Sequence, residues 1–259
     1  MTTWRRIGPP LVAFVLVISV WEVLVRVLGV EAYLLPPPSA IALAGYHHAG
    51  MLASAMRVTA TSALLGFGLS MVLGISAGLL LASSRILERA LYPYALFLQT
   101  VPIVAVAPLL VLWFGVGWRA VAVSAFIVSV FPVVANTLAG VRGVEPALRD
   151  LFRLHRASRT ATLWKLELPA ALPQIVTGLR VASGLAVIGA IVGEFVAGIS
   201  EGSAGLGIAV LSANRELRTD LLFAAVFSAA VLGLSLFTVV NLAGARLLRR
   251  WHPSAKERS

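Results

Sequence analysis

Six long apolar segments run through the 259-residue chain, separated by shorter stretches that carry charge, proline or glycine. A helix needs about 20 apolar residues to cross the hydrocarbon core of a bilayer, and each segment is long enough. We therefore expect an all-α, polytopic membrane protein in which residues 1–259 form a single membrane domain. The pattern predicts six spans, at about residues 9–30, 57–82, 91–113, 118–140, 173–198 and 221–248.

One interruption between the spans, residues 142–173, is basic and amphipathic. Pro146 favours a helix start, because the first helical position loses nothing from the missing N–H of proline. Ser158 is expected to cap a second short helix, which Pro169 and Pro173 should stop before the next span. This helix–turn–helix predicts a docking site for a soluble partner, since the first helix separates its arginines from one apolar face formed by Ala147, Leu148, Leu151, Phe152 and His155.

Composition supports a bilayer protein: 59% of residues are hydrophobic, 12% are charged and the mean hydropathy is +0.93, whereas about a quarter of residues are charged in soluble domains. Arg5 and Arg6 precede an apolar run that is too long for a signal peptide and lacks a small-residue cleavage site, so we interpret it as an uncleaved span. The chain has no cysteine, which excludes disulfides, thiolate ligands and cysteine nucleophiles.

The net charge of +10 is a topology signal rather than a sign of nucleic-acid binding. If the N-terminus is cytoplasmic, five basic residues lie outside: Arg26, Arg57, Arg119, Arg215 and Arg218. The remaining sixteen of the 21 are then cytoplasmic: Arg5, Arg6, Arg85, Arg89, Arg142, Arg149, Arg153, Arg156, Arg159, Lys165, Arg180, Arg246, Arg249, Arg250, Lys256 and Arg258. This bias predicts a multi-pass plasma-membrane protein with both termini and the 142–173 loop in the cytoplasm.

Small residues recur at every fourth position of the second span: Ser62, Gly66, Ser70, Gly74, Gly78 and Ala82. Such a stripe lets helices approach closely, either within one subunit or at a dimer seam.

The third span carries Pro93, Pro102 and Pro108 with Gln99 between them, which predicts a kink. The kinked helix either borders a pathway or merely shapes the bundle.

Glu194 lies about 21 Å beyond Arg180 along the fifth span, in its outer half. A carboxyl group there either serves a pathway or gate or forms a structural hydrogen bond between helices. Glu22 and Arg26, four residues apart, are interpreted as a structural ion pair.

Catalytic and cofactor chemistry is not indicated. His47 and His48 have no second ligand cluster, so no metal site is expected. The Gly205-Leu206-Gly207 segment lacks the preceding strand and the following lysine of a phosphate-binding loop. The sequence also shows no combination of serine, histidine and carboxylate residues that would indicate a catalytic site.

The interruption resembles the EAA loop of bacterial ABC importer permeases, which reads E, A, A, three residues, G, nine residues, I, any residue, L, P. Here the same spacing carries Asp150-Leu151-Phe152, then Arg156 at the glycine position, then Leu166-Glu167-Leu168-Pro169. The nitrate, sulfonate, taurine and pyrimidine-precursor branch of those permeases is similar in further segments: Pro108-Leu109-Leu110, Trp113-Phe114-Gly115, Phe131-Pro132, Leu168 to Pro173, Gly178-Leu179-Arg180, Gly193-Glu194 and Gly205-Leu206-Gly207.

This resemblance implies a type I ABC importer permease fold, with two permease subunits, by default an identical pair, forming the path in the bacterial inner membrane. It also implies two ATPase subunits that use ATP and magnesium, and an extracytoplasmic solute-binding protein, while this chain binds no cofactor and is not an enzyme. The ATPase-coupling residues would be Glu145, Leu148, Asp150, Leu151, Phe152, Arg156, Ala157, Ser158, Leu168 and Pro169. The pathway residues would be Gln99, Pro102, Pro108 and Glu194.

The branch implies either a sulfonate- or nitrate-like anion or a pyrimidine- or riboflavin-type vitamin precursor as solute, and the segments 156–159 and 164–169 favour the precursor. Two alternatives remain open: a secondary transporter or channel that works alone, although no duplicated halves are visible, and a membrane scaffold whose basic loop recruits a partner without transport.

Overall fold

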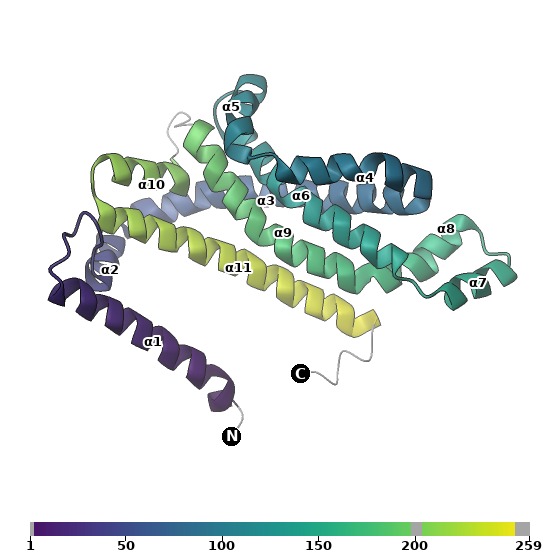
Figure 1. The fold of residues 1–259 in the computed structure, drawn as a ribbon, viewed down its shortest axis with the longest axis horizontal. Coiled ribbons are helices and arrows are strands. Elements are labelled where there is room, and N and C mark those ends of the chain that lie inside the picture. Colours follow the sequence, from purple (N-terminus) through teal and green to yellow (C-terminus); the bar gives the residue numbers. More distant parts are fainter. Residues whose placement is uncertain (1–2, 198–203, 252–259) are drawn as a thin grey trace.

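The computed structural model describes residues 3–197 and 204–251. Over these residues the protein is helical and contains no strand, as predicted. Figure 1 shows the short helices at the two ends of a bundle, with α7 and α8 at one end and α2 and α10 at the other. The helices are α1 (Thr3–Val27), α2 (Pro38–His47), α3 (Ala49–Ser83), α4 (Arg85–Thr100), α5 (Ile103–Phe114), α6 (Trp118–Arg142), α7 (Pro146–Leu154), α8 (Arg159–Thr162), a π-helical turn (Leu163–Glu167), α9 (Leu168–Ala197), α10 (Leu206–Arg215) and α11 (Thr219–Trp251).

The third predicted span is not one straight helix. Helices α4 and α5 meet at an angle of 98°, and the described residues contain six spans only if this bent pair counts as one. Pro102 disfavours a helical conformation for the residue before it, and Val101 is extended (φ −71°, ψ 122°). The expected kink is therefore confirmed, but it is large enough to interrupt the helix.

Helices α3, α6 and α9 form the centre of the bundle, and the small-residue stripe of α3 lies against α6. A Cβ atom added at Gly74 would lie 2.8 Å from Cβ of Val133, and one at Gly78 would lie 2.6 Å from Cβ of Thr137. Ser70 is within hydrogen-bonding distance of the Ser129 hydroxyl, at 2.6 Å. Of the two possibilities that the sequence leaves open, the stripe therefore serves packing within the subunit.

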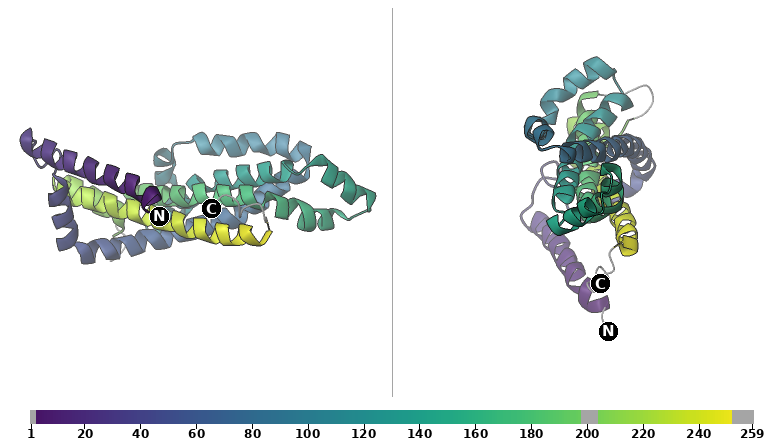
Figure 2. Two further views of the ribbon diagram at one scale, coloured as in Figure 1. Left: turned by 90° about the horizontal axis from the view of Figure 1, so that it is seen from below. Right: turned by 90° about the vertical axis from the view of Figure 1, so that its right-hand side faces the viewer.

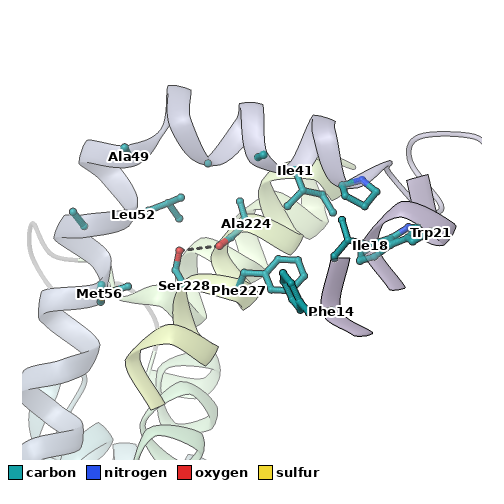
Figure 3. Close-up of a pocket in the computed structure, with 14 residues that line it drawn as sticks. Phe14, Ile18, Trp21, Ile41, Ala49, Leu52, Met56, Ala224, Phe227 and Ser228 are labelled. Carbon is teal, nitrogen blue, oxygen red and sulfur yellow. Dashed lines mark hydrogen bonds between the residues drawn. The ribbon is translucent and has the colours of Figure 1, made fainter. Parts of the chain in front are cut away.

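Helix α1 packs only lightly against its own chain. Its Trp21 ring meets Phe223 of α11 edge-on, with centroids 5.8 Å apart. Between α1, α2, α3 and α11 lies an apolar cavity of about 590 Å³, and Figure 3 shows Phe14, Ile18 and Trp21 of α1 at one side of it. Most of the surface of α1 is therefore left for lipid or another subunit to cover.

At the α2 end, α1 is fixed by polar contacts. The predicted ion pair is present, with Arg26 Nε donating to Glu22 Oε1 at 2.7 Å. The second carboxylate oxygen of Glu22 accepts from the backbone N–H of Ser39 at 3.0 Å, in the first turn of α2. The pair therefore also orients α2, in line with the structural role expected from the sequence.

The α3–α6 contact generates a prediction for two neighbouring glycines. Gly66→Ala should destabilise the permease by about 1–3 kcal/mol, because the new Cβ would lie 2.6 Å from the carbonyl oxygen of Ala122 and 2.8 Å from the backbone nitrogen of Phe126. Thermal unfolding in mild detergent measures the difference. Gly68→Ala is the matched control, since its Cβ meets nothing within 4 Å and alanine favours the helix. Equal unfolding midpoints for the two variants would contradict close packing at Gly66.

Candidate functional site

Helices α7 and α8 form a protruding arm at one end of the bundle, which we call the handle (residues 145–167; Figure 1 and Figure 2, left). Pro146 occupies the first turn of α7, and Ser158 Oγ accepts a hydrogen bond from the backbone N–H of Ala161 at 3.2 Å. Both predicted helix starts are therefore confirmed. No residue of α7 is buried, and Leu148 and Leu151 are 41% and 47% exposed. An apolar face is thus presented outward, away from the chain's own core.

The predicted stop at Pro169 and Pro173 is wrong, because helix continues from Arg159 to Ala197. The π-helical turn precedes the first proline, and the N–H of Leu168 donates to the carbonyl of Leu163, five residues back. A proline is tolerated where a local π adjustment accommodates the missing donor and the bulk of the ring. The handle is therefore continuous with α9 rather than separated from it by a loop.

The turn between α7 and α8 centres on Arg156, which has a left-handed backbone with φ of +50°. The N–H of Arg156 donates to the carbonyl of Arg153, and the N–H of Ala157 donates to the carbonyl of Phe152 at 3.0 Å. Such hydrogen bonds end a helix at a left-handed residue, the position where glycine is preferred. Arg156 thus adopts a conformation suited to the glycine of the EAA pattern.

This turn predicts opposite effects for two substitutions of one residue. Arg156→Gly should leave the fold intact or stabilise it by about 1 kcal/mol, whereas Arg156→Val should destabilise the turn, because a β-branched residue tolerates φ above zero poorly. Protease sensitivity of the handle in detergent-purified protein is the measurement. Cleavage at the same rate in both variants would rule out a strained turn at this position.

Arginine side chains connect the handle to the ends of the spans through hydrogen bonds and ion pairs. Arg149 Nη2 donates to the carbonyl of Val141 at 2.6 Å and lies 3.3 Å from Glu167 Oε1. Arg142 pairs with Glu88 at 2.5 Å, so α6 is tied to α4. From α8, Arg159 Nη2 donates to the carbonyl of Ser83 at the end of α3, at 2.6 Å. A movement of the handle therefore acts on several spans together.

At the opposite end of the bundle, Glu194 is buried and joins three helices. Its Oε1 accepts from the hydroxyl of Thr59 on α3 at 2.7 Å, and its Oε2 accepts from the N–H of Gly207 in the first turn of α10 at 2.7 Å. The N–H of Leu206 donates to Thr59 Oγ1 at 2.8 Å. A Cβ atom at Gly205 would overlap the carboxyl group. The geometry favours the structural alternative for Glu194, and the Gly205-Leu206-Gly207 segment serves this contact.

The contact between α3, α9 and α10 can be tested by substitution of Thr59. Thr59→Val keeps the shape but leaves Leu206 N–H and one oxygen of Glu194 without partners, which should cost about 1–3 kcal/mol. Thr59→Ser retains the hydroxyl and is the matched control. Thermal unfolding in detergent, read with hydrogen exchange of α10, distinguishes them. Exchange protection of α10 that is unchanged in Thr59→Val would argue against this anchor.

The other sequence candidates lie apart from these two sites. Gln99 is exposed near the end of α4, Pro102 stands at the bend and Pro108 is exposed within α5. His48 contacts Arg218 and the carbonyl of Ala44, and no cluster of metal-ligating residues occurs among residues 3–197 and 204–251.

Arg180 is counted with the cytoplasmic residues in the topology prediction, although the predicted fifth span, residues 173–198, also contains it. It lies within α9, two residues after Gly178, and an added Cβ at Gly178 would be 2.8 Å from the carbonyl oxygen of Pro132 in α6. Its Nε is buried and has no hydrogen-bond partner in the described part of the chain.

The spans, the broken α4–α5 pair and the handle define a helical membrane protein with a protruding arm at one end. The family model of the binding-protein-dependent transport system inner membrane component matches residues 70–253, so the chain belongs to this family. It is therefore the permease component of an ABC importer in the inner membrane. In this family separate ATPase subunits hydrolyse ATP, the permease itself binds no cofactor, and a solute-binding protein is a further partner.

Known relatives match nearly the whole chain. The riboflavin transport system permease protein RibX of Chloroflexus aurantiacus is 35% identical, over 97% of this chain and 92% of RibX. The formylaminopyrimidine transport permease protein ThiX of Halalkalibacterium halodurans is 34% identical, over 90% of this chain and 91% of ThiX. Among solved structures, an inward-facing MetNI methionine ABC transporter matches with a TM-score of 0.64 and 19% identity, covering 77% of this chain and 95% of that one. The last likeness shows the fold, that of a type I importer permease.

Proposed function

We propose that the handle is the contact through which an ATPase subunit drives this permease, with the apolar face of α7 buried in a groove of the ATPase. The observation that carries the proposal is the exposure of Leu148 and Leu151 on a helix that has no buried residue of its own. An exposed apolar face on a short polar arm marks a protein interface. The proposed coupling set is that of the EAA-like loop: Glu145, Leu148, Asp150, Leu151, Phe152, Arg156, Ala157, Ser158, Leu168 and Pro169.

The connections of the handle support this mechanism. Helix α8 continues through the π-helical turn into α9, while Arg149 holds α7 to the end of α6. Closure of two ATPase subunits on ATP would move the handle as a rigid piece and tilt α6 and α9 with it. Tilting of these spans would expose the path alternately to the two sides of the membrane.

We propose that two identical copies of the chain enclose the path, with both termini and the handle in the cytoplasm. The bent α4–α5 pair, with Gln99, Pro102 and Pro108, is the proposed wall, since its large apolar side chains are exposed in one subunit. The outward-facing side of α9 adds two exposed polar groups three residues apart, Gln174 and Thr177. Polar side chains there suit a water-lined surface better than lipid. Glu194 would then hold the outer cover, α10, in place.

For the solute we propose a small molecule handed over by an extracytoplasmic binding protein: either a sulfonate- or nitrate-like anion or a riboflavin- or pyrimidine-type vitamin precursor. The names of RibX and ThiX favour a heterocyclic precursor. Binding measurements on the cognate binding protein would decide between the two classes.

The docking proposal predicts that Leu151→Asp uncouples ATP hydrolysis from uptake. A carboxylate placed in an apolar contact costs several kcal/mol when buried, so the ATPase should dissociate or hydrolyse ATP without transport. Leu151→Met is the matched control, because a similar volume and polarity preserve the contact.

Co-purification of the ATPase from mild-detergent membranes and uptake into proteoliposomes are measured for both variants. Normal coupling in Leu151→Asp would remove α7 from the interface. Absence of any co-purifying ATPase, even with the unaltered chain, would favour a transporter that works alone or a scaffold.

A further inference from the structure

A cavity of about 510 Å³ lies at the base of the handle, where α3 and α6 end. Its walls come from the last turn of α3, the end of α6, α7, α8 and the π-helical turn. We call it the arginine pocket, after the four arginines that line it: Arg142, Arg149, Arg153 and Arg159. The proposed docking face of α7 is a separate feature of the handle, formed by its apolar side chains.

Donors outnumber acceptors in this pocket. Each guanidinium carries five N–H donors, and in the described part of the chain each of the four has one or two acceptors. The Nε atoms of Arg142 and Arg149 are buried and have no hydrogen-bond partner in the described part of the chain. Buried donors without partners are uncommon and costly. The side chains of Arg142, Arg149 and Arg153 are partly exposed, so their other N–H groups can donate to an acceptor group in the cavity.

The carboxylates nearby do not fill this need. Among the described residues Glu167 is the one acidic side chain in the pocket wall, and it lies 3.3 Å from Arg149 Nη2. Glu88 and Asp150 each pair with one arginine from outside the wall. Four cations therefore face the cavity against a single lining carboxylate.

We propose that the arginine pocket binds the phosphate of an anionic phospholipid. A guanidinium offers a planar pair of donors that matches two phosphate oxygens. The pocket lies at the ends of spans α3 and α6, which is the level of lipid headgroups, and basic pockets between membrane helices are suited to anionic headgroups.

The apolar part of the wall argues for lipid rather than free phosphate. Leu79 and Ala82 of α3 and Leu163 of the π-helical turn line the same cavity as the arginines. These side chains give the glycerol and first methylene groups of a lipid an apolar contact, which a free phosphate ion does not need. The site does not depend on the proposed docking of an ATPase.

The test compares two pairs of conservative substitutions in the full-length permease, purified in mild detergent with the subunits that accompany it. Arg142→Lys with Arg149→Lys keeps both charges but removes the Nε–H groups and the fork. Arg85→Lys with Arg89→Lys is the matched control, because these exposed arginines begin α4 near the same end of the spans and do not line the pocket. Retention of phosphatidylglycerol by delipidated protein is measured by native mass spectrometry.

We expect the unaltered protein and the control to retain phosphatidylglycerol, and the pocket variant to retain it about tenfold more weakly. Thermal unfolding without lipid checks that the variant is folded. Thr160→Glu places a carboxylate at the rim and should also weaken retention, which supplies a second test if the double variant is unstable.

Three results would overturn the proposal. Equal retention by the pocket variant and the control would show that the arginines are not the site. Equal retention of phosphatidylcholine would show that the lipid need not be anionic. Stabilisation by inorganic phosphate alone, equal to that given by phosphatidylglycerol, would assign the pocket to a free ion.

Discussion

Close approach of the α3, α6 and α9 backbones is the constraint on which the rest of the structure depends. Lipid tails are as apolar as leucine, so the hydrophobic effect gives membrane helices little reason to associate, and they rely on van der Waals contact and hydrogen bonds. Glycine at positions 66, 74 and 78 of α3 permits that contact with α6. Gly189 and Gly193 of α9 approach α6 as closely, at Ser124 and Ala125. Helix α6 is thereby packed closely against both partners, and the handle follows its end.

Features governed by a few neighbouring residues could be predicted from the sequence. The helix starts at Pro146 and Ser158 follow from local backbone rules and are present. The spans follow from the length of the apolar runs. The interruption at Val101 and Pro102 also follows from a local rule, but its angle of 98° does not, because the angle depends on what the two halves pack against.

Other features depend on contacts that no local pattern encodes. Thr59 and Glu194 are 135 positions apart, and nothing in either segment indicates that they meet. Pro169, like Pro102, should disfavour helix at the residue before it. The helix nevertheless continues through Pro169, because the π-helical turn before it accommodates the proline ring and the missing N–H. Proline alone therefore does not decide whether a membrane helix ends. The unusual Arg156 position could be located by spacing, while its left-handed backbone could be established only from the structure.

The continuous helix from Arg159 to Ala197 also has a mechanical consequence. Its 39 residues extend over about 58 Å at 1.5 Å per residue, so a tilt of a few degrees at the handle displaces the far end by several ångströms. Glu194 lies near that far end and is bonded to α10. One helix therefore joins the handle at one end of the bundle to α10 at the other end.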